Sequence, residues 1–295
     1  MLIDCHVHAV RSHSVPEGGR KNFTTADELL PMLDEAGIDM AVVLPLVSPE
    51  ARYQLSTSED VLEICAEHPD RLIPFCNVDP RMASNSPNAD LSHHLDFYSQ
   101  AGCKGVGEMT ANLPFDDPMV WNLFKHCSDY GMPLTFHISP AVGVSYGLAD
   151  DPGLPRLERS LREFPDLAFL GHSQPFWAEV TGGLDDQTRR GYPKGKVLPG
   201  GRTVELFERY ENLYGDLSAG SGFNAISRDP EFGYPFLERF QDRMLFGTDI
   251  CAAGQELPIV PFMHQAVEQG HISRQAYENL CWRNINRLLD LGLEE

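Results

Sequence analysis

The sequence is poor in basic residues and has no long hydrophobic runs. It carries 23 Lys and Arg against 43 Asp and Glu, a formal net charge of −20 at pH 7. This balance argues against binding to a nucleic-acid backbone, which needs clustered positive charge. No uncharged apolar run reaches the roughly 18 residues of a membrane span, and the apolar start is too short for a secretory signal. We therefore expect a cytoplasmic protein with a small-molecule substrate, with no nucleic-acid or membrane partner, and leave homo-oligomerisation open.

The sequence also lacks the signals of a disulfide framework and of a nucleotide-binding sheet. Its seven cysteines are an odd number and form no CxxC pair, which favours reduced thiols. No Gly-rich phosphate fingerprint follows the first predicted strand, so an open, doubly wound sheet is disfavoured.

Short apolar runs alternate with amphipathic segments along the whole chain. Eight of the runs predict strands, and their C-terminal ends follow one another at the spacing of one βα unit, roughly 30 to 45 residues. Eight such units in succession predict an α/β protein, a single (β/α)₈ TIM barrel over residues 1–295. The predicted strands are Leu2–His6, Met40–Leu46, Leu72–Asp79, Gly105–Glu108, Leu134–His137, Leu167–His172, Leu213–Leu217 and Met244–Asp249.

The amphipathic segments between these runs predict helices, and glycines follow several of them where a left-handed cap would end the helix. Pro31 interrupts the first helix, which must begin later than its pattern suggests or kink there. Two C-terminal helices, Ile259–Glu268 and Arg274–Leu291, would close and cap the barrel. The other predicted helices are Ala26–Ala36, Glu59–Glu67, Leu91–Ala101, Pro118–Tyr130, Leu154–Phe164, Val204–Tyr210 and Pro235–Phe240.

A His-x-His pair, His6 and His8, stands at the end of the first predicted strand. Alternate residues of a strand point to the same face, so the two imidazoles lie a few Å apart. Two neutral imidazoles in this arrangement suit a divalent metal such as zinc. A pair of surface histidines is the alternative interpretation.

Four further polar residues end other predicted strands. Glu108, His137, His172 and Asp249 close the fourth, fifth, sixth and eighth strands. Because the chemistry of a (β/α)₈ barrel lies at the C-terminal ends of its strands, these side chains should converge. Together with the His pair they predict a divalent-metal site.

The chain resembles the amidohydrolase superfamily along nearly its whole length. It is most similar to the amidohydrolase-2 branch, which contains metal-dependent hydrolases and aminocarboxymuconate-semialdehyde-type decarboxylases. Four segments carry the resemblance: Asp4–His8, Ala36–Val43, Leu245–Asp249 and Asn284–Leu289.

The resemblance implies roles for the residues at the strand ends. His6, His8, His137 and Asp249 would coordinate a divalent metal. His172 would be either a catalytic hydrogen-bonding residue or a ligand of a second metal.

Glu108 departs from the pattern, since many members of this branch have no carboxylate there. Its position resembles that of the bridging glutamate in TatD-type hydrolases. The alternative is an acid that orients a ligand histidine. We therefore expect Zn²⁺, or else Mn²⁺, with one or two ions per chain.

This set of residues predicts a metal-dependent enzyme. A metal-bound water of lowered pKa would attack the substrate, with Asp249 as the base and His172 stabilising developing charge. The expected reaction is hydrolysis of an amide, ester or lactone bond in a small anionic substrate. The alternative is non-oxidative decarboxylation of an aromatic or unsaturated carboxylic acid. A barrel that binds metal or ligand without turnover is a third interpretation.

A long basic loop follows the sixth predicted strand and suggests the anionic substrate. Residues 187–202 contain five basic and no acidic side chains, Arg189, Arg190 and Lys194 among them. Loops of this length are often lids, and these cations could attract a carboxylate or phosphate. Trp177 could form an apolar wall of the same pocket. The alternative for the loop is that it is exposed and balances local acidity, or that it contacts a partner subunit. The alternative for Trp177 is that it packs the sixth helix.

Overall fold

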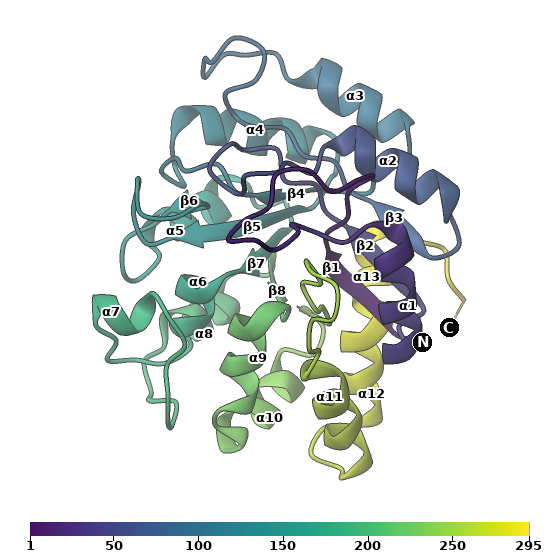
Figure 1. Cartoon of the computed structure of the whole chain (residues 1–295). Helices are drawn as coiled ribbons and strands as arrows, with labels where there is room; N and C mark the ends of the chain where they lie inside the picture. The colour runs from purple at the N-terminus through teal and green to yellow at the C-terminus, as the bar shows by residue number, and fades with distance from the viewer. Residues whose placement is uncertain (295) are drawn as a thin grey trace.

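The computed structural model describes residues 1–294 and consists of parallel strands surrounded by helices (Figure 1). The eight barrel strands follow the predicted order along the chain. A ninth, β6 (Leu148–Ala149), pairs with β5 beside the barrel. The barrel strands are β1 (Ile3–Val7), β2 (Met40–Val43), β3 (Leu72–Pro74), β4 (Val106–Met109), β5 (Leu134–Ser139), β7 (Phe169–His172), β8 (Leu213–Asp216) and β9 (Met244–Leu245).

The strands close into a barrel through two seams. Continuous pairing joins β1, β2 and β3 in one group and β4, β5, β7, β8 and β9 in the other. A parallel bridge between Cys76 and Val106 joins the chain after β3 to β4, and one between Val7 and Ile250 joins β1 to the chain after β9. The N–H of Cys5 also donates to the carbonyl of Phe246 at 2.9 Å. The predicted TIM barrel is therefore confirmed.

Helices alternate with the strands and pack around them (Figure 1). Those that link barrel strands are α1 (Ala26–Ala36), α2 (Ser58–Glu67), α3 (Ser92–Gln100), α4 (Pro118–Asp129), α5 (Pro155–Glu163), α6 (Gln174–Ala178), α7 (Asp186–Arg189), α8 (Arg202–Arg209), α9 (Ala219–Ser227) and α10 (Pro230–Arg239). Sequence analysis missed α6, α7 and α9, which are short or rich in glycine.

The helix boundaries follow from local sequence. Thr25 and Glu28 form a capping box at the start of α1, and Gly37 ends it with a left-handed φ of 69°. The helix begins at Ala26 and continues through Pro31, which lies on its exposed side. The later start that the sequence allowed is therefore wrong, and water can solvate the carbonyl that the missing Pro31 N–H leaves free.

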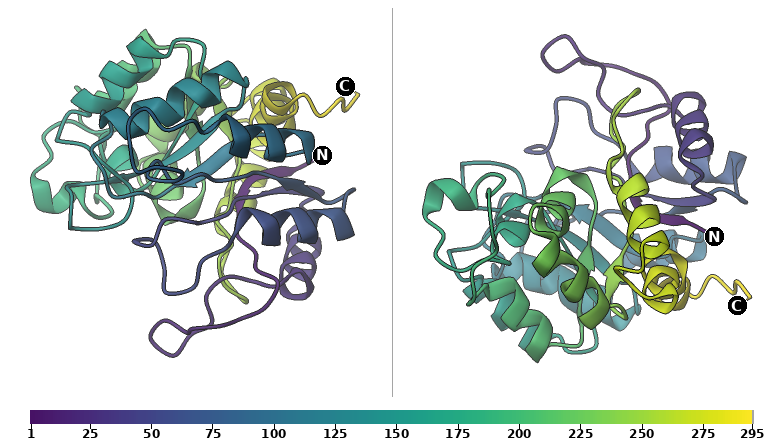
Figure 2. Two further views of the ribbon diagram at one scale, coloured as in Figure 1. Left: turned by 90° about the horizontal axis from the view of Figure 1, so that it is seen from above. Right: turned by 90° about the horizontal axis from the view of Figure 1, so that it is seen from below.

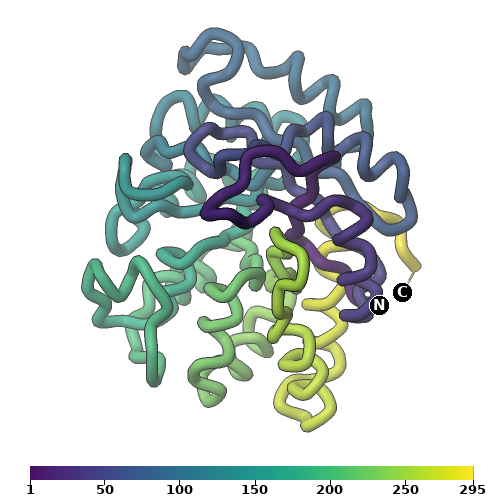
Figure 3. The backbone as a smooth tube through the Cα atoms, in the orientation of Figure 1, coloured from purple at the N-terminus to yellow at the C-terminus, as the bar shows by residue number. Residues whose placement is uncertain are grey.

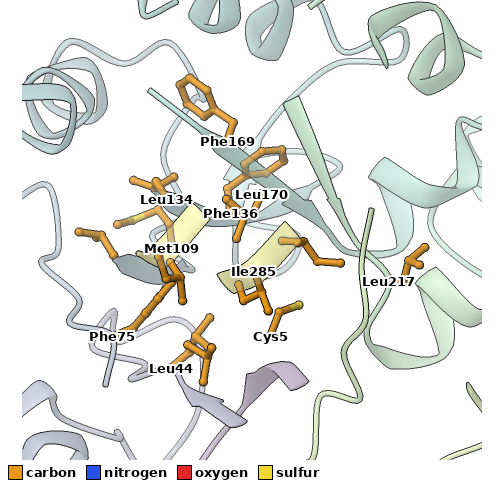
Figure 4. Close-up of a cluster of buried hydrophobic side chains, with 14 of the residues drawn as sticks. Cys5, Leu44, Phe75, Met109, Leu134, Phe136, Phe169, Leu170, Leu217 and Ile285 are labelled. Atoms are coloured by element: carbon orange, nitrogen blue, oxygen red, sulfur yellow. The ribbon is translucent and has the colours of Figure 1, made fainter. Parts of the chain in front are cut away.

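C-terminal helices pack against the barrel, as expected. They are α11 (Ile259–Glu268), α12 (Arg274–Glu278), the π-helical turn η1 (Asn279–Arg283) and α13 (Asn284–Leu289). The side chain of Asn284 donates to the carbonyl of Met244 at 2.8 Å. Figure 4 shows Ile285 among the buried side chains of the barrel, near Cys5.

Three strands end three or more residues earlier than predicted, and the residues that follow them form loops at one end of the barrel. β2, β3 and β9 end at Val43, Pro74 and Leu245. The segment after β1 projects from the body of the molecule in both views of Figure 2. Figure 3 shows that the two ends of the chain lie on the same side of the molecule. None of the helices in the described part of the chain is long and apolar enough to cross a membrane.

Candidate metal centre

The two histidines of the first strand point their Nε2 atoms at one place. These atoms lie 3.0 Å apart, and both side chains are buried. The Nδ1 atom of His6 lies 2.6 Å from Oδ2 of Asp216, and Nδ1 of His8 lies 2.7 Å from the carbonyl oxygen of Leu44. With each Nδ1 occupied in this way, the rings are fixed and both Nε2 atoms are available to a cation.

Two carboxylates approach the same Nε2 atoms. Oδ1 of Asp249 lies 3.4 Å from Nε2 of His8 and 3.8 Å from that of His6. Oε2 of Glu108 lies 3.5 Å and 3.7 Å from the same two atoms. Ligands of one Zn²⁺ ion, each bonded at about 2.0–2.2 Å, are separated by roughly 3–4 Å. These four side chains therefore fit a divalent cation.

The other oxygen of Glu108 faces a second group of donors. Its Oε1 lies 2.6 Å from Nδ1 of His137 and 3.8 Å from Nε2 of His172. Together the three residues form a candidate ligand group beside that of His6, His8 and Asp249. The structure thus places His137 with His172 and sets Glu108 between the two groups, the position that a bridging ligand requires.

His172 is held from behind by β8 and the turn that follows it. Its Nδ1 lies 3.0 Å from Oγ of Ser218 and 3.4 Å from Oδ2 of Asp216. Its Nε2 faces the centre, 4.0 Å from Oδ2 of Asp249. Burial lowers the pKa of His172, so this imidazole is neutral at physiological pH.

The remaining charges of the centre are strongly coupled. Burial alone would lower the pKa of His6, but the carboxylates of Asp216, Glu108 and Asp249 outweigh it and raise that pKa well above its ordinary value. Burial would raise the pKa of Glu108, yet the nearby imidazoles, His137 first, lower it well below its usual range. A bound divalent cation would replace the positive charge that protonated imidazoles otherwise provide.

Sequence analysis missed Asp216 and Ser218, which hold His6 and His172. Asp216 is a buried acid at the end of β8. Glu108 is likewise a buried acid and lies near the end of β4. A polar residue at the end of an apolar run is the signal that identified Glu108. The same criterion, applied to the run 213–217, would have found Asp216.

An aromatic ring and a cation lie beside this centre. The ring centroid of Tyr146 is 4.4 Å from that of His137, and the guanidinium of Arg52 is 5.5 Å from the Tyr146 centroid. Burial raises the pKa of the Tyr146 phenol, which therefore stays neutral. Arg52 also lines a hollow of about 480 Å³ together with Cys251, two residues after Asp249. No strand or helix periodicity marks Tyr146 or Arg52 as a site residue, since both lie in loops.

Tyr146 belongs to a Gly-x-Ser-x-Gly segment, residues 143–147, the pattern of a serine nucleophile elbow. Here the segment is a loop between β5 and β6, and Ser145 is exposed. The Oγ atom of Ser145 lies 3.0 Å from Oγ of Ser139. Neither the strand-turn-helix setting nor a partner imidazole is present for Ser145, so this serine is no nucleophile.

The predicted substrate-binding residues lie apart from the centre. Trp177 is buried among aromatic side chains, and its Nε1 donates to the carbonyl of Asp216 at 2.8 Å, so it packs behind the site and does not form its wall. Arg189 is also buried and pairs with Glu179. Since a buried guanidinium needs such a partner, it holds the loop together and is not available to a substrate. Arg190 and Lys194 are exposed on the same loop.

Comparisons with known proteins agree with the fold. A family model described as amidohydrolase matches residues 3–291. Among curated proteins, no sequence matches the chain. Solved structures match over nearly their full length at low identity, which makes them evidence of the fold alone.

One is an uncharacterised TIM-barrel protein from Bordetella bronchiseptica, at 18% identity and a TM-score of 0.63, with 98% of each chain covered. Another is 2,6-dihydroxybenzoate decarboxylase from Rhizobium, at 17% identity and a TM-score of 0.61, with 99% of each chain covered. A third is 5-carboxyvanillate decarboxylase from Novosphingobium aromaticivorans, complexed with manganese and a nitrobenzoic acid. It has 15% identity and a TM-score of 0.59, with coverage of 99% of this chain and 96% of that one.

Proposed function

The chain belongs to the amidohydrolase family, and we propose on that premise that it is a metal-dependent decarboxylase of a small aromatic or unsaturated carboxylic acid. The observation that carries the proposal is the juxtaposition of the buried donor group with Tyr146 and Arg52. An aromatic face and a cation beside a metal centre suit a flat, anionic substrate. The decarboxylases of aromatic acids among the solved structures support the same choice.

A divalent metal, when bound by His6, His8, Glu108 and Asp249, supplies Lewis-acid chemistry that polarises a substrate carboxylate or a neighbouring hydroxyl. The remaining steps fall to the side chains. Loss of CO₂ leaves an electron pair on the substrate carbon, and that carbon must take up one proton. That proton comes from water. Burial would raise the pKa of Asp249, but the imidazoles, His8 first, outweigh it and lower that pKa, so the ionised carboxylate would take a proton from a water molecule, leaving hydroxide to solvent, and pass it to the carbon.

Arg52 is the cation that this proposal assigns to the substrate. Its side chain is half-buried, its guanidinium lies 5.5 Å from the ring centroid of Tyr146, and its Nη1 lies 3.5 Å from Oε2 of Glu17. A carboxylate or phenolate that lies against Tyr146 would come within its reach. The exposed Arg190 and Lys194 of the basic loop stay candidates for attracting an anion from solvent.

Hydrolysis, the first expectation from the sequence, is the second candidate. It is favoured by Glu108, whose two oxygens face two separate groups of donors. A carboxylate in that position could hold two cations, and two-metal sites are typical of hydrolytic enzymes. The decarboxylase proposal takes precedence because the solved structures of known activity that we describe above are decarboxylases.

The native metal is proposed to be Zn²⁺ or Mn²⁺. Imidazole and carboxylate donors accept either ion. Zn²⁺ is the ion that the sequence favours, and a manganese-containing structure with the same fold supports Mn²⁺.

Product analysis tests the function directly. Protein loaded with Zn²⁺ or Mn²⁺ would be incubated with a panel of hydroxylated benzoic acids, and in parallel with lactones and esters, in ¹⁸O-labelled water. Release of CO₂ from a carboxylic acid, with deuterium on the product carbon when the reaction is repeated in D₂O, supports decarboxylation. Incorporation of ¹⁸O with no release of CO₂ contradicts it and supports hydrolysis. The variant Asp249→Asn is the control for adventitious activity.

A further inference from the structure

Asp249 reaches the centre through an uncommon backbone conformation. Its φ is 57°, in the left-handed region that residues other than glycine rarely adopt. Its N–H donates to the carbonyl of His6 at 2.9 Å. Asp249 therefore lies beside β1, beyond the end of β9 at Leu245, and its turn directs the carboxylate toward the imidazoles of His6 and His8. Because this backbone conformation is unfavourable for an aspartate, neighbouring residues must stabilise it.

On one side the turn is held by a buried carboxylate that takes no part in the donor groups. Asp4 accepts hydrogen bonds from the N–H of His6 and from the N–H of Thr248, each at 3.0 Å, and from the hydroxyl of Thr248. That hydroxyl also accepts the N–H of Ile250 at 3.3 Å. Thr248 thus fixes the backbone on both sides of Asp249. Through its hydrogen bonds to Thr248 and His6, Asp4 connects this turn to the strand that carries the His pair.

On the other side the turn is held by Gln255. Its Nε2 donates to the carbonyl of Asp249 at 2.8 Å, and its Oε1 accepts the N–H of Cys251 at 3.1 Å. Both groups of the amide are therefore used to fix the backbone on either side of Ile250. These contacts act on Asp249 through its main chain and leave its carboxylate available to a cation.

We propose that Asp4, Thr248 and Gln255 are positioning residues that hold Asp249 in its left-handed conformation and so set the distance from its carboxylate to the two imidazoles. The inference rests on the proposed metal-dependent function. It assigns the aspartate that precedes the His-x-His pair to the geometry of the metal ligands, in addition to the stability of the barrel. Loss of one member should weaken metal binding without a matching loss of stability.

Co²⁺ is the probe that tests this, because its visible absorption reports the ligand geometry around it. We would measure its dissociation constant, and the spectrum of the bound ion, for Thr248→Val and Thr248→Ser. The valine loses the hydroxyl and keeps the shape, so Co²⁺ binding should weaken about 10- to 100-fold, with an altered spectrum. The serine keeps the hydroxyl and should restore both values.

Two further variants keep the test decisive. Gln255→Met changes a half-exposed side chain, so it should fold, and it should alter the Co²⁺ spectrum in the same direction as Thr248→Val. Thr203→Val is the matched control, because it removes a buried threonine hydroxyl that donates to the carbonyl of Phe176, outside the donor groups.

Wild-type affinity and spectrum in both Thr248→Val and Gln255→Met would overturn the proposal, as would an equal loss in Thr203→Val. These readouts need no turnover. A chain that binds Co²⁺ as described but releases no CO₂ would overturn the decarboxylase function alone.

Discussion

The Nδ1 atom of His6, on the first strand of the barrel, lies 2.6 Å from Oδ2 of Asp216, at the end of β8. Both side chains are buried. The same carboxylate oxygen lies 3.4 Å from Nδ1 of His172. Asp216 therefore orients two imidazoles of the centre from behind and fixes which nitrogen of each ring faces inward.

Asp216→Asn should weaken metal binding about 10- to 100-fold, because an amide cannot accept from both rings and supply the charge that sets their orientation. Competition with a chelator of known affinity measures the effect. Asp150→Asn is a suitable control, since Asp150 is also buried but accepts from the backbone N–H groups of Arg156 and Leu157 at the start of α5. Equal affinities of Asp216→Asn and wild type would show that Asp216 has no such role.

Glu108→Gln should lower the number of ions bound per chain. Each oxygen of Glu108 faces a separate group of donors, so loss of its charge should weaken cation binding by both groups. Elemental mass spectrometry of protein purified without added metal gives the number. Glu179→Gln, which changes a buried glutamate paired with Arg189, should leave the metal content unchanged. Full occupancy in Glu108→Gln would limit Glu108 to orienting His137.

Metal affinity should rise with pH from about pH 6 to pH 9, by roughly tenfold for each proton displaced per pH unit. Nearby carboxylates, which outweigh burial, raise the pKa values of His6 and His8, so a cation must displace protons that ordinary histidines would already have lost.

Without metal the pH dependence runs in the opposite direction, because the stability of the protein falls as the pH rises. The stability that a proton on His6 provides is fully present below the ordinary pKa of histidine and is lost as the pH rises through the raised one. Thermal unfolding with and without Zn²⁺ across this range measures both trends. If the stabilisation by Zn²⁺ did not change with pH, the inference that carboxylates raise the pKa values of His6 and His8 would be wrong.

Arg52→Met should raise KM for an anionic substrate about 10- to 100-fold, the value of a charge-assisted hydrogen bond, and leave metal content unchanged. Steady-state kinetics with a substrate found in the product screen measures this. Arg190→Met and Lys194→Met test the basic loop in the same assay. An effect confined to these loop variants would transfer substrate binding from Arg52 to the loop.

The sequence predicts the barrel and the gathering of its polar strand ends for one physical reason. Parallel strands of a barrel end on the same face, so residues such as Glu108 and His172 converge wherever the strand periodicity is read correctly. The family resemblance is confirmed by the match over residues 3–291. Both inferences depend on pattern and order along the chain.

Two of the residues that sequence analysis missed depend on the paths of loops. Arg52 and Tyr146 meet only because the loops after β2 and β5 fold toward each other, and no periodicity encodes that approach. Arg189 was assigned to the substrate because of its charge, but burial gives it Glu179 as a partner. Composition describes a loop and does not say which of its side chains turn inward.

The bridge between Val7 and the chain after β9 has a consequence for biogenesis. His6 and His8 lie at the first barrel strand, β1, whereas Asp249 follows β9 and leaves the ribosome only after all eight barrel strands have been made. A nascent chain therefore cannot assemble the ligands of this cation until its last strand docks against its first. Metal capture would be a late event of maturation, and the bound ion would cross-link the place where the barrel closes.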